Sequence, residues 1–181
     1  GAALSAHPDI NQLVFTGSVP TGIAIATAAA QNVVPCVLEL GGKSAAIVHD
    51  DADLDAFEED LRWGIFFNAG QVCSAMSRVI VHQSRYQELL DRAVAVAESL
   101  SVGPGIERAE FGANMGAMVS EQQCQRATAM VETAVAEGAQ CAFGGHRIVH
   151  PGAFLAPTVL SGVQPSMRIA SEEVFGPVLS V

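Results

Sequence analysis

Residues 12–39, QLVFTGSVPTGIAIATAAAQNVVPCVLE, decide the fold class because two apolar runs flank an alanine-rich one. The run at 12–16 predicts a short buried strand that ends at a Gly-Ser step. The alanine-rich run at 19–31 predicts a helix, and the run at 33–39 predicts a second strand. A strand, a helix and a strand in this order form a βαβ unit, in which the two strands are parallel. These residues therefore predict an α/β fold.

The alternation of strands and helices continues to the end of the chain. Strands are expected at 44–48, at 79–82, at 139–143 and in the final PVLSV. Helices are expected where the acidic run at 50–60 continues to about residue 67, over 84–100 and over 120–137. Residues 144–166 contain three prolines and are expected to be rich in loops. Two adjacent glycines within 40–43 mark the expected domain boundary, so that residues 1–41 close one domain and residues 42–181 form a second.

The composition excludes several classes of protein. A net charge of −10, with only 9 basic residues, argues against a surface for nucleic acids or anionic membranes. No apolar run reaches the length of a membrane span. The four cysteines have irregular spacings without a C-x-x-C pair; they are Cys36, Cys73, Cys124 and Cys141. This pattern predicts reduced thiols in a cytoplasmic protein rather than a disulfide framework.

Two stretches imitate binding motifs but fail in detail. LELGGKS at 38–44 ends like a phosphate-binding P-loop, but Val37 occupies the first glycine position and a strand is expected to follow where the motif needs a helix. The acidic run DDADLDAFEED at 50–60 begins like an EF-hand, but Ala56 and Arg62 stand where that loop needs Gly and Glu. The sequence therefore predicts neither an ATP-binding P-loop nor a calcium or other metal site.

Two side chains could carry chemistry, and each has an ordinary alternative. Glu39 lies in an apolar strand, where burial would favour a general base, whereas an edge-strand position would leave the carboxylate in solvent. Cys73 lies in FFNAGQVCSAMSR at 66–78, where small neighbours leave room for a substrate; a lone cysteine is nevertheless more often a core residue. The other three cysteines lie in apolar patterns, which predicts that they serve packing.

Two further segments are ambiguous when taken alone. In FTGSVPTG at 15–22, a Gly-Ser turn before a helix can direct backbone N–H groups at a phosphate. The spacing is not G-x-G-x-x-G, and an ordinary tight turn explains the same residues. In SEEVFGPVLSV at 171–181, two carboxylates precede an aromatic residue and a Gly-Pro turn, and a plain turn into a strand explains that pattern too.

Four of these segments together resemble the signature segments of the NAD(P)-dependent aldehyde dehydrogenases. They are FTGS at 15–18, LELGGK at 38–43, FFNAGQVCSAMSR at 66–78 and EEVFGPV at 172–178, and they match in type, order and approximate spacing. The resemblance implies the end of a Rossmann-type cofactor domain followed by most of an α/β catalytic domain. It also implies an enzyme that oxidises an aldehyde to a carboxylic acid with NAD or NADP.

The resemblance assigns catalytic roles to two residues. Cys73 stands at the position of the nucleophile, which forms a thiohemiacetal and then a thioester. Glu39 stands at the position of the base that activates the deacylating water, and its presence favours a hydrolytic member over a CoA-acylating one. The backbone N–H of Cys73 is expected to donate to the oxyanion.

The resemblance also assigns cofactor contacts. The implied positions are Gly17 and Ser18 at the pyrophosphate, Gly41 beside the nicotinamide, Glu173 on the nicotinamide ribose and Phe175 beside that ring. The run NAGQVCSA further resembles members that act on betaine aldehyde and related amino-aldehydes.

Other parts of the family's machinery are expected outside residues 1–181. They include the oxyanion asparagine, the residues that grip the adenine ribose and the C-terminal oligomerisation strand. The isolated chain is therefore expected to be inactive or barely active, and the full-length protein to be a homo-oligomer that binds a small aldehyde.

Two other classes of protein compete with this interpretation. A cofactor-independent acyl hydrolase would need a histidine beside Cys73, and His49 and His82 are the nearest in sequence. A structural descendant without activity would have no need of both Cys73 and Glu39.

Overall fold

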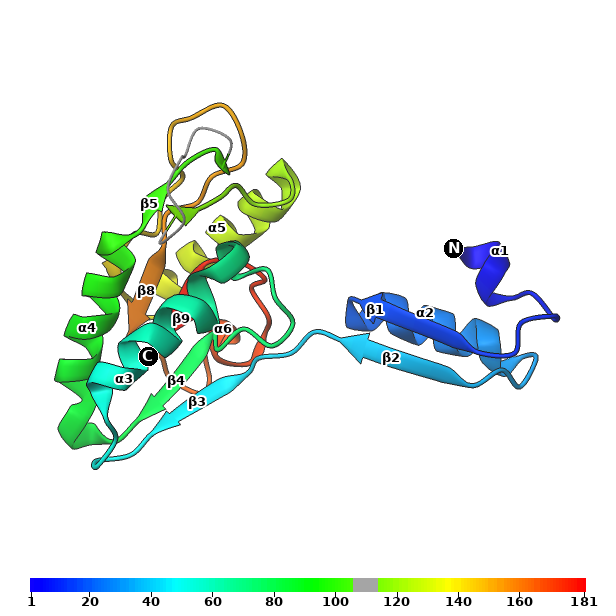
Figure 1. Ribbon diagram of the computed structural model, residues 1–181, viewed down its shortest axis with the longest axis horizontal. Coiled ribbons are helices and arrows are strands. Elements are labelled where there is room, and N and C mark those ends of the chain that lie inside the picture. Colours follow the sequence, from blue (N-terminus) through cyan, green and yellow to red (C-terminus); the bar gives the residue numbers. More distant parts are fainter. Residues whose placement is uncertain (106–113) are drawn as a thin grey trace. The chain divides into compact units, whose positions relative to one another are not determined.

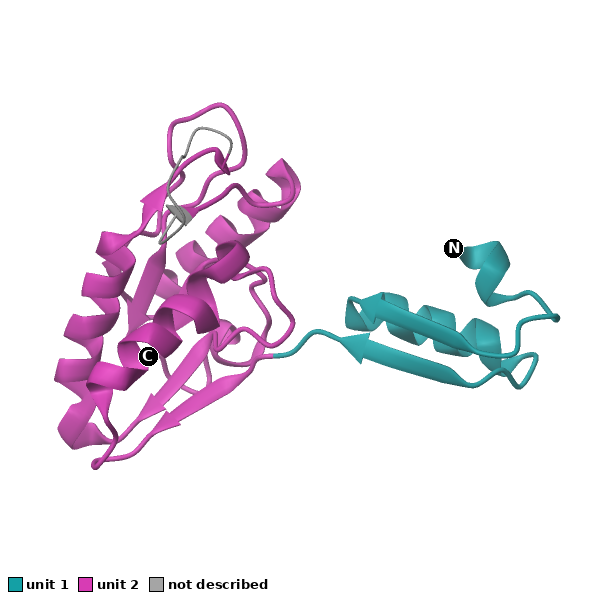
Figure 2. Cartoon of the chain, in the orientation of Figure 1, with its two compact units in different colours: residues 1–42 teal, residues 43–181 magenta. Residues whose placement is uncertain are grey.

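The computed structural model describes residues 1–105 and 114–181. They form two compact units, Gly1–Gly42 and Lys43–Val181 (Figure 2). Strands and helices alternate along both units, which confirms the predicted α/β fold class. The assignment of the two units to a cofactor-binding and a catalytic domain stays a prediction.

The first unit contains the predicted βαβ arrangement (Figure 1). Its elements are α1 (Ala2–Ser5), β1 (Leu13–Gly17), α2 (Val19–Ala30) and β2 (Cys36–Leu40). The strands β1 and β2 are parallel, and their register runs from Leu13 opposite Cys36 to Gly17 opposite Leu40. The helix lies close to the second strand at Gly22, because a Cβ there would be 2.7 Å from the Leu40 side chain.

The second unit is built on a five-stranded sheet with the order β3-β4-β9-β8-β7. The strands are β3 (Ala45–Val48), β4 (Arg78–Val81), β7 (Gln140–Phe143), β8 (Thr158–Ser161) and β9 (Val178–Ser180). The first four strands in the spatial order are parallel, and β7 is antiparallel to β8. A separate parallel pair joins β5 (Ser101–Val102) to β6 (Asn114–Met115).

The helices of the second unit cover this sheet and enclose its core. They are α3 (Leu54–Leu61), the π-helix η1 (Arg62–Phe66), the 3₁₀-helices η2 (Phe67–Gly70) and η3 (Gln83–Arg85), α4 (Tyr86–Ser99), α5 (Glu121–Ala136) and α6 (Arg168–Ser171). The central strands β8 and β9 are buried along their whole length. Helix α4 packs against β7 and β8, and η1 packs against β9. The central strands and these helices therefore form the hydrophobic core of the unit.

Two predictions of local structure were incomplete. Residues 144–166 are loop-rich as predicted, but they also contain β8, the most deeply buried strand of the sheet together with β9. The helix expected to run to about residue 67 is regular only to Leu61 and then widens into the π-helix η1. Within residues 1–105 and 114–181, no helix combines the length and the apolar character needed to cross a membrane.

Candidate active site

Cys73 is an exposed thiol in a tight turn, which excludes the core alternative. The turn is closed by the Ala75 N–H, which donates to the Val72 carbonyl at 3.0 Å. Among the described residues, the backbone N–H groups of Cys73 and Ser74 have no acceptor. The turn therefore presents one thiol and two unused hydrogen-bond donors to solvent.

The other cysteines differ from the prediction at one position. Cys124 is fully buried, as a packing residue should be, and burial raises the pKa of its thiol. Cys36 is half-buried, whereas Cys141 is exposed and does not serve the core. The Cys141 thiol instead donates to the Phe143 carbonyl at 3.4 Å.

The turn with Cys73 is anchored on two sides. The Met76 N–H donates to the carbonyl of Gly64 in the π-helix at 2.8 Å, and a Cβ at Gly64 would be 2.1 Å from the Met76 side chain. On the other side, the Ser180 N–H of β9 donates to the Ser77 carbonyl at 3.0 Å. Such π-helical turns occur often at functional sites. Because the turn is fixed at both ends, Cys73 has a defined position.

Backbone strain is concentrated in two of the segments that carry the family resemblance. Among the described residues, four residues other than glycine have a positive φ. Three of them lie in these segments: Asn68 (52°), Ala69 (54°) and Phe175 (52°). A left-handed conformation costs about 1–2 kcal/mol at each such residue. Strain of this kind persists where the surroundings enforce it, and it clusters at functional sites.

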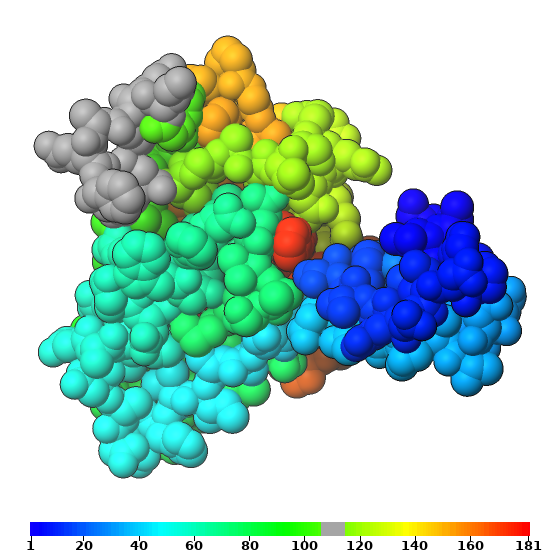
Figure 3. Space-filling view, turned by 45° about the vertical axis from the view of Figure 1, so that its right-hand side comes forward, coloured from blue at the N-terminus to red at the C-terminus, as the bar shows by residue number. Residues whose placement is uncertain are grey.

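The two strained segments are in contact with each other. Gly70 (φ +68°) faces the backbone of the other segment, because a Cβ there would lie 2.1 Å from the carbonyl oxygen of Gly176. Figure 3 shows a small red patch, from the end of the chain, beside the green-cyan surface of residues around 70. Gly70 and Ala69 are buried, so their small size serves this packing. Of the small neighbours of Cys73, only Ser74 is exposed beside it.

Two glutamines fix the strained segments. Gln71 accepts from the Val119 N–H through Oε1 (2.9 Å) and donates to the Asn68 carbonyl through Nε2 (3.1 Å). Gln123, in the first turn of α5, donates through Nε2 to the carbonyls of Val174 and Phe175, each at 2.9 Å. Both side chains satisfy backbone groups that no helix or strand satisfies.

The two adjacent carboxylates of the EEVFG segment have different surroundings. Glu172 is exposed and forms an ion pair with Arg168 at 2.8 Å, and this hydrogen bond lowers the pKa of the Glu172 carboxyl. In Glu173, Oε1 is buried without a partner, whereas Oε2 keeps contact with solvent and also has no partner. Arg126 donates to the backbone carbonyl of Glu173 at 3.4 Å. Glu173 therefore offers one outward oxygen as an acceptor.

A buried cationic cluster lies beside this segment. Arg78 donates to the Ala170 carbonyl at 2.9 Å and to the Lys43 carbonyl at 3.2 Å. The Lys43 ammonium nitrogen is buried without a hydrogen-bond partner among the described residues. Burial is the main cause that lowers the pKa of Lys43 to about 8; Arg78 lowers it further, and Glu173 opposes the shift.

The remaining predicted site residues belong to the first unit. Glu39 lies in β2 opposite Thr16 and is exposed, so of the two surroundings considered for this carboxylate the structure shows the solvated one. Gly17 ends β1, and Ser18 is the N-cap residue of α2, with its hydroxyl 2.9 Å from that of Thr21. Gly41 follows the last residue of β2. The structure thus shows two groups of site residues, one on each unit: Cys73, Glu173 and Phe175 share the second.

Within residues 1–105 and 114–181, the histidine that an acyl hydrolase would need is not bonded to Cys73. His82 bonds to Ser84 at 2.8 Å and caps η3, and His49 is exposed after β3. Among the described residues, no histidine forms a hydrogen bond with Cys73, and no group of His, Cys, Asp and Glu side chains is arranged to hold a metal ion.

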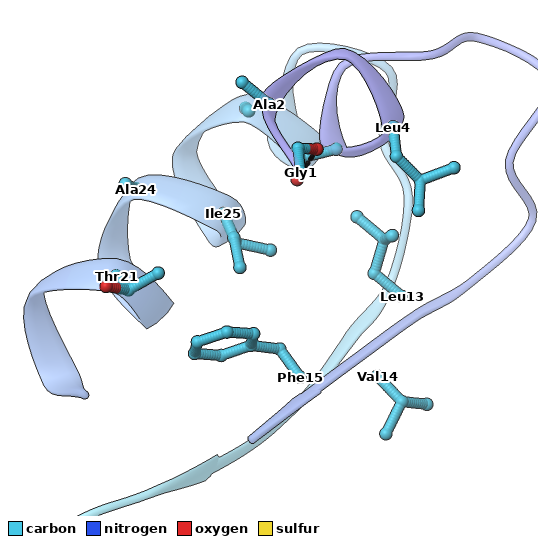
Figure 4. Close-up of a pocket in the computed structure, with 11 residues that line it drawn as sticks. Gly1, Ala2, Leu4, Leu13, Val14, Phe15, Thr21, Ala24 and Ile25 are labelled. Atoms are coloured by element: carbon cyan, nitrogen blue, oxygen red, sulfur yellow. Dashed lines mark hydrogen bonds between the residues drawn. The ribbon is translucent and has the colours of Figure 1, made fainter. Parts of the chain in front are cut away.

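An apolar cavity in the first unit is not the site of the chemistry. Figure 4 shows it between α1, β1 and α2, with Leu13, Phe15 and Ile25 pointing into it. Its volume is about 420 Å³, and none of the side chains that line it titrates.

Sequence reasoning missed the residues that support the site. Gln71, Arg78 and Gln123 were not singled out, and Lys43 was considered only as part of the failed P-loop and of the LELGGK segment. Arg78 and Gln71 lie inside the segment around Cys73, so their position was the one available signal.

Comparison with known proteins places the chain in a family. The model of the aldehyde dehydrogenase family matches residues 1–181. Betaine aldehyde dehydrogenase 1 of Oryza sativa subsp. japonica and peroxisomal aminoaldehyde dehydrogenase 1 of Pisum sativum are each 45% identical over the whole chain, which spans 36% of their length.

Solved structures agree over the same range. The NAD+ complex of aldehyde dehydrogenase from Bacillus cereus matches with a TM-score of 0.95 at 41% identity, over the whole chain and 36% of that protein. Betaine aldehyde dehydrogenase from Staphylococcus aureus, also in complex with NAD+, matches with a TM-score of 0.93 at 37% identity, over the whole chain and 36% of its own. The family resemblance of the four segments is thereby confirmed, and the chain belongs to the aldehyde dehydrogenase family.

Proposed function

We propose that the full-length protein oxidises an aldehyde to a carboxylic acid with NAD+ or NADP+, and that Cys73 is its nucleophile. The observation that carries the proposal is the exposed thiol on a strained turn, packed backbone to backbone against the segment that holds Glu173. Family membership and the NAD+ complexes of related enzymes support it. The proposal assigns residues 1–41 to the cofactor-binding domain and residues 42–181 to the catalytic domain.

The residues present fit a dinucleotide. The outward Oε2 of Glu173 is an unpaired acceptor of the kind that a ribose hydroxyl needs. The N-terminus of α2, a helix of 12 residues, follows Gly17 and Ser18 and offers N–H groups and a favourable dipole to a pyrophosphate. Gly41 and Phe175 complete the proposed contacts beside the nicotinamide. A nicotinamide held there would supply the hydride acceptor that oxidation of the Cys73 adduct to a thioester requires.

The residues of this chain perform the other steps. The Cys73 thiolate adds to the aldehyde carbon, and the oxygen gains the negative charge of a thiohemiacetal. The free N–H groups of Cys73 and Ser74 are available to stabilise that charge. Glu39 takes a proton from the water that attacks the thioester, which releases the acid and returns the thiol.

The second unit favours a cationic substrate. Trp63 and Phe67 are each 55% exposed, with ring centroids 5.9 Å apart, on the helical turns that lead to Cys73. Aromatic faces attract ammonium groups, and quaternary ammonium most of all. Since the similar plant enzymes are named for betaine aldehyde and aminoaldehydes, we assign an aldehyde with an amino or trimethylammonium group as the substrate.

The cellular setting and assembly are also part of the proposal. Four free cysteines suit a compartment that keeps thiols reduced, such as the cytoplasm predicted from the sequence. Two similar proteins have the words peroxisomal and chloroplastic in their names. We therefore propose a compartment that keeps thiols reduced, with the cytoplasm as one such compartment. We further propose that the full-length protein is a homo-oligomer.

Pre-steady-state kinetics of the full-length protein tests the two catalytic roles separately. We expect a burst of NADH with wild type and with Glu39→Gln, but slow steady-state turnover with Glu39→Gln, because only hydrolysis of the thioester needs the base. Cys73→Ala should lose both phases. A different result would establish that the protein is an acyl hydrolase. Wild type would then hydrolyse an activated ester at a steady rate, the cofactor would not change that rate, and no NADH would form.

A further inference from the structure

The buried ammonium of Lys43 has no role in the steps described above. Its Nζ and the Oε1 of Glu173 are both buried without hydrogen-bond partners among the described residues, and no direct ion pair joins the two. An isolated buried charge is costly, so its presence calls for a compensating interaction. Glu173 is the acidic side chain whose charge acts on Lys43.

Arg78 fixes these two residues relative to each other through the backbone. One guanidinium nitrogen donates to the Lys43 carbonyl and the other donates to the carbonyl of Ala170, three residues before Glu173. Arg126 holds the Glu173 carbonyl from the side of α5. The segment with Lys43 and the segment with Glu173 are thus joined, while both side-chain charges remain unpaired.

The two oxygens of Glu173 face different surroundings, and Lys43 explains the difference. Oε1 is buried, whereas Oε2 keeps contact with solvent, and the charge of Glu173 acts on the buried ammonium of Lys43. A carboxylate without an inward attraction would turn both oxygens to water, because hydration of both is favourable.

We propose that Lys43 is a positioning residue for Glu173: its buried ammonium attracts Oε1 inward and so presents Oε2 to the ribose hydroxyls of a dinucleotide. The inference rests on the proposed function, because it needs Glu173 to be the ribose acceptor. Lys43 itself touches neither the cofactor nor the aldehyde in this assignment. Removal of its charge should therefore weaken cofactor binding through Glu173.

The test measures NAD+ binding to the full-length protein by isothermal titration, without substrate. We expect Lys43→Met to weaken NAD+ binding by about tenfold, and Lys43→Arg, which keeps the charge, to restore most of it. Glu173→Gln should weaken binding as well, and the double variant should be no weaker than Glu173→Gln alone. This non-additivity separates action through Glu173 from a general effect on the fold.

The pH profile of binding provides a second readout. The charged groups that act on Lys43 are Arg78 and Glu173, and burial together with Arg78 lowers the pKa of the Lys43 ammonium to about 8. Wild-type affinity for NAD+ should therefore fall as the pH rises through about 8, while that of Lys43→Arg stays constant.

The possible outcomes distinguish failure of the proposed role of Lys43 from failure of the proposed function. If wild type binds NAD+ and Lys43→Met binds equally well, or if the effects of Lys43→Met and Glu173→Gln simply add, the role of Lys43 is refuted. If wild type binds no dinucleotide at all, the proposed function fails first. Lys43→Met replaces a buried charge with an apolar side chain of similar length, and its unfolding midpoint verifies that it is folded.

Discussion

Replacing Gly70 with alanine would place a Cβ atom 2.1 Å from the Gly176 carbonyl oxygen and 2.9 Å from the nitrogen of Pro177. Both neighbours are backbone atoms, so no flexible side chain can move away. The left-handed φ of +68° adds a cost of about 1–2 kcal/mol for any residue with a Cβ. The clash adds about 1–3 kcal/mol, as in other overpacked interiors.

Gly162 supplies a matched control in the same unit. Its φ is +67°, but no atom lies within 4 Å of the Cβ that alanine would add. Gly162→Ala should therefore show the conformational cost alone, and Gly70→Ala the sum of both costs. The difference in the free energy of unfolding between the two variants should be about 1–3 kcal/mol.

Two assays on the full-length protein check this expectation. Thermal unfolding should give Gly70→Ala the lower midpoint. Alkylation of Cys73 by iodoacetamide, followed by peptide mass spectrometry, should change in rate only in Gly70→Ala, because displacement of Gly70 also moves the turn. Equal midpoints, together with a wild-type alkylation rate in both variants, would refute the close contact between the two strained segments.

Three further predictions concern other parts of the chain. Lys43→Met should be more stable than wild type by up to about 3 kcal/mol at pH 7. Because folding lowers the pKa of Lys43 from 10.5 to about 8, the unfolded chain binds more protons than the folded chain between these pH values. The free energy of unfolding of wild type therefore rises across that window. Unfolding midpoints at a series of pH values should show the difference in stability between Lys43→Met and wild type becoming smaller as the pH rises. Val33 is exposed and has a φ of 57°, a conformation that glycine adopts more easily than valine. Val33→Gly should therefore raise the free energy of unfolding of the first unit by roughly 0.5–1 kcal/mol. Val34→Gly should lower it, and urea denaturation measures both changes. Gln123→Leu removes both hydrogen bonds from Gln123 to the strained segment that contains Phe175. We expect this variant to bind NAD+ more weakly than wild type in a calorimetric titration, while its helix content stays the same.

The regular elements were predictable because their signals are local. The βαβ unit at 12–39 and the helices α4 and α5 follow apolar periodicity that neighbouring residues alone determine. Strand β8 was missed for a physical reason: it lies between prolines and glycines and begins and ends with Thr and Ser. Its character comes from burial by α4 and by the neighbouring strands, which no local pattern records.

The site itself was predictable only in part. Cys73 is exposed, whereas composition and spacing alone favoured a core residue, and its role as nucleophile stays a prediction. Small residues near Cys73 indicated clearance for a substrate, but Gly70 is small because another backbone touches it. The contacts of Gln71, Gln123, Arg78 and Lys43 join residues 35 to 92 positions apart, and sequence spacing cannot show them.

In the proposed reaction, Cys73 carries the aldehyde as a covalent adduct. The most direct measurement mixes the full-length protein with an amino-aldehyde and NAD+, quenches with acid within the NADH burst and locates the acyl group by peptide mass spectrometry. We expect an acyl mass on the peptide that contains Cys73, and we expect more of this species in Glu39→Gln. An adduct on Cys36, Cys124 or Cys141, or continued NADH formation by Cys73→Ala, would contradict it.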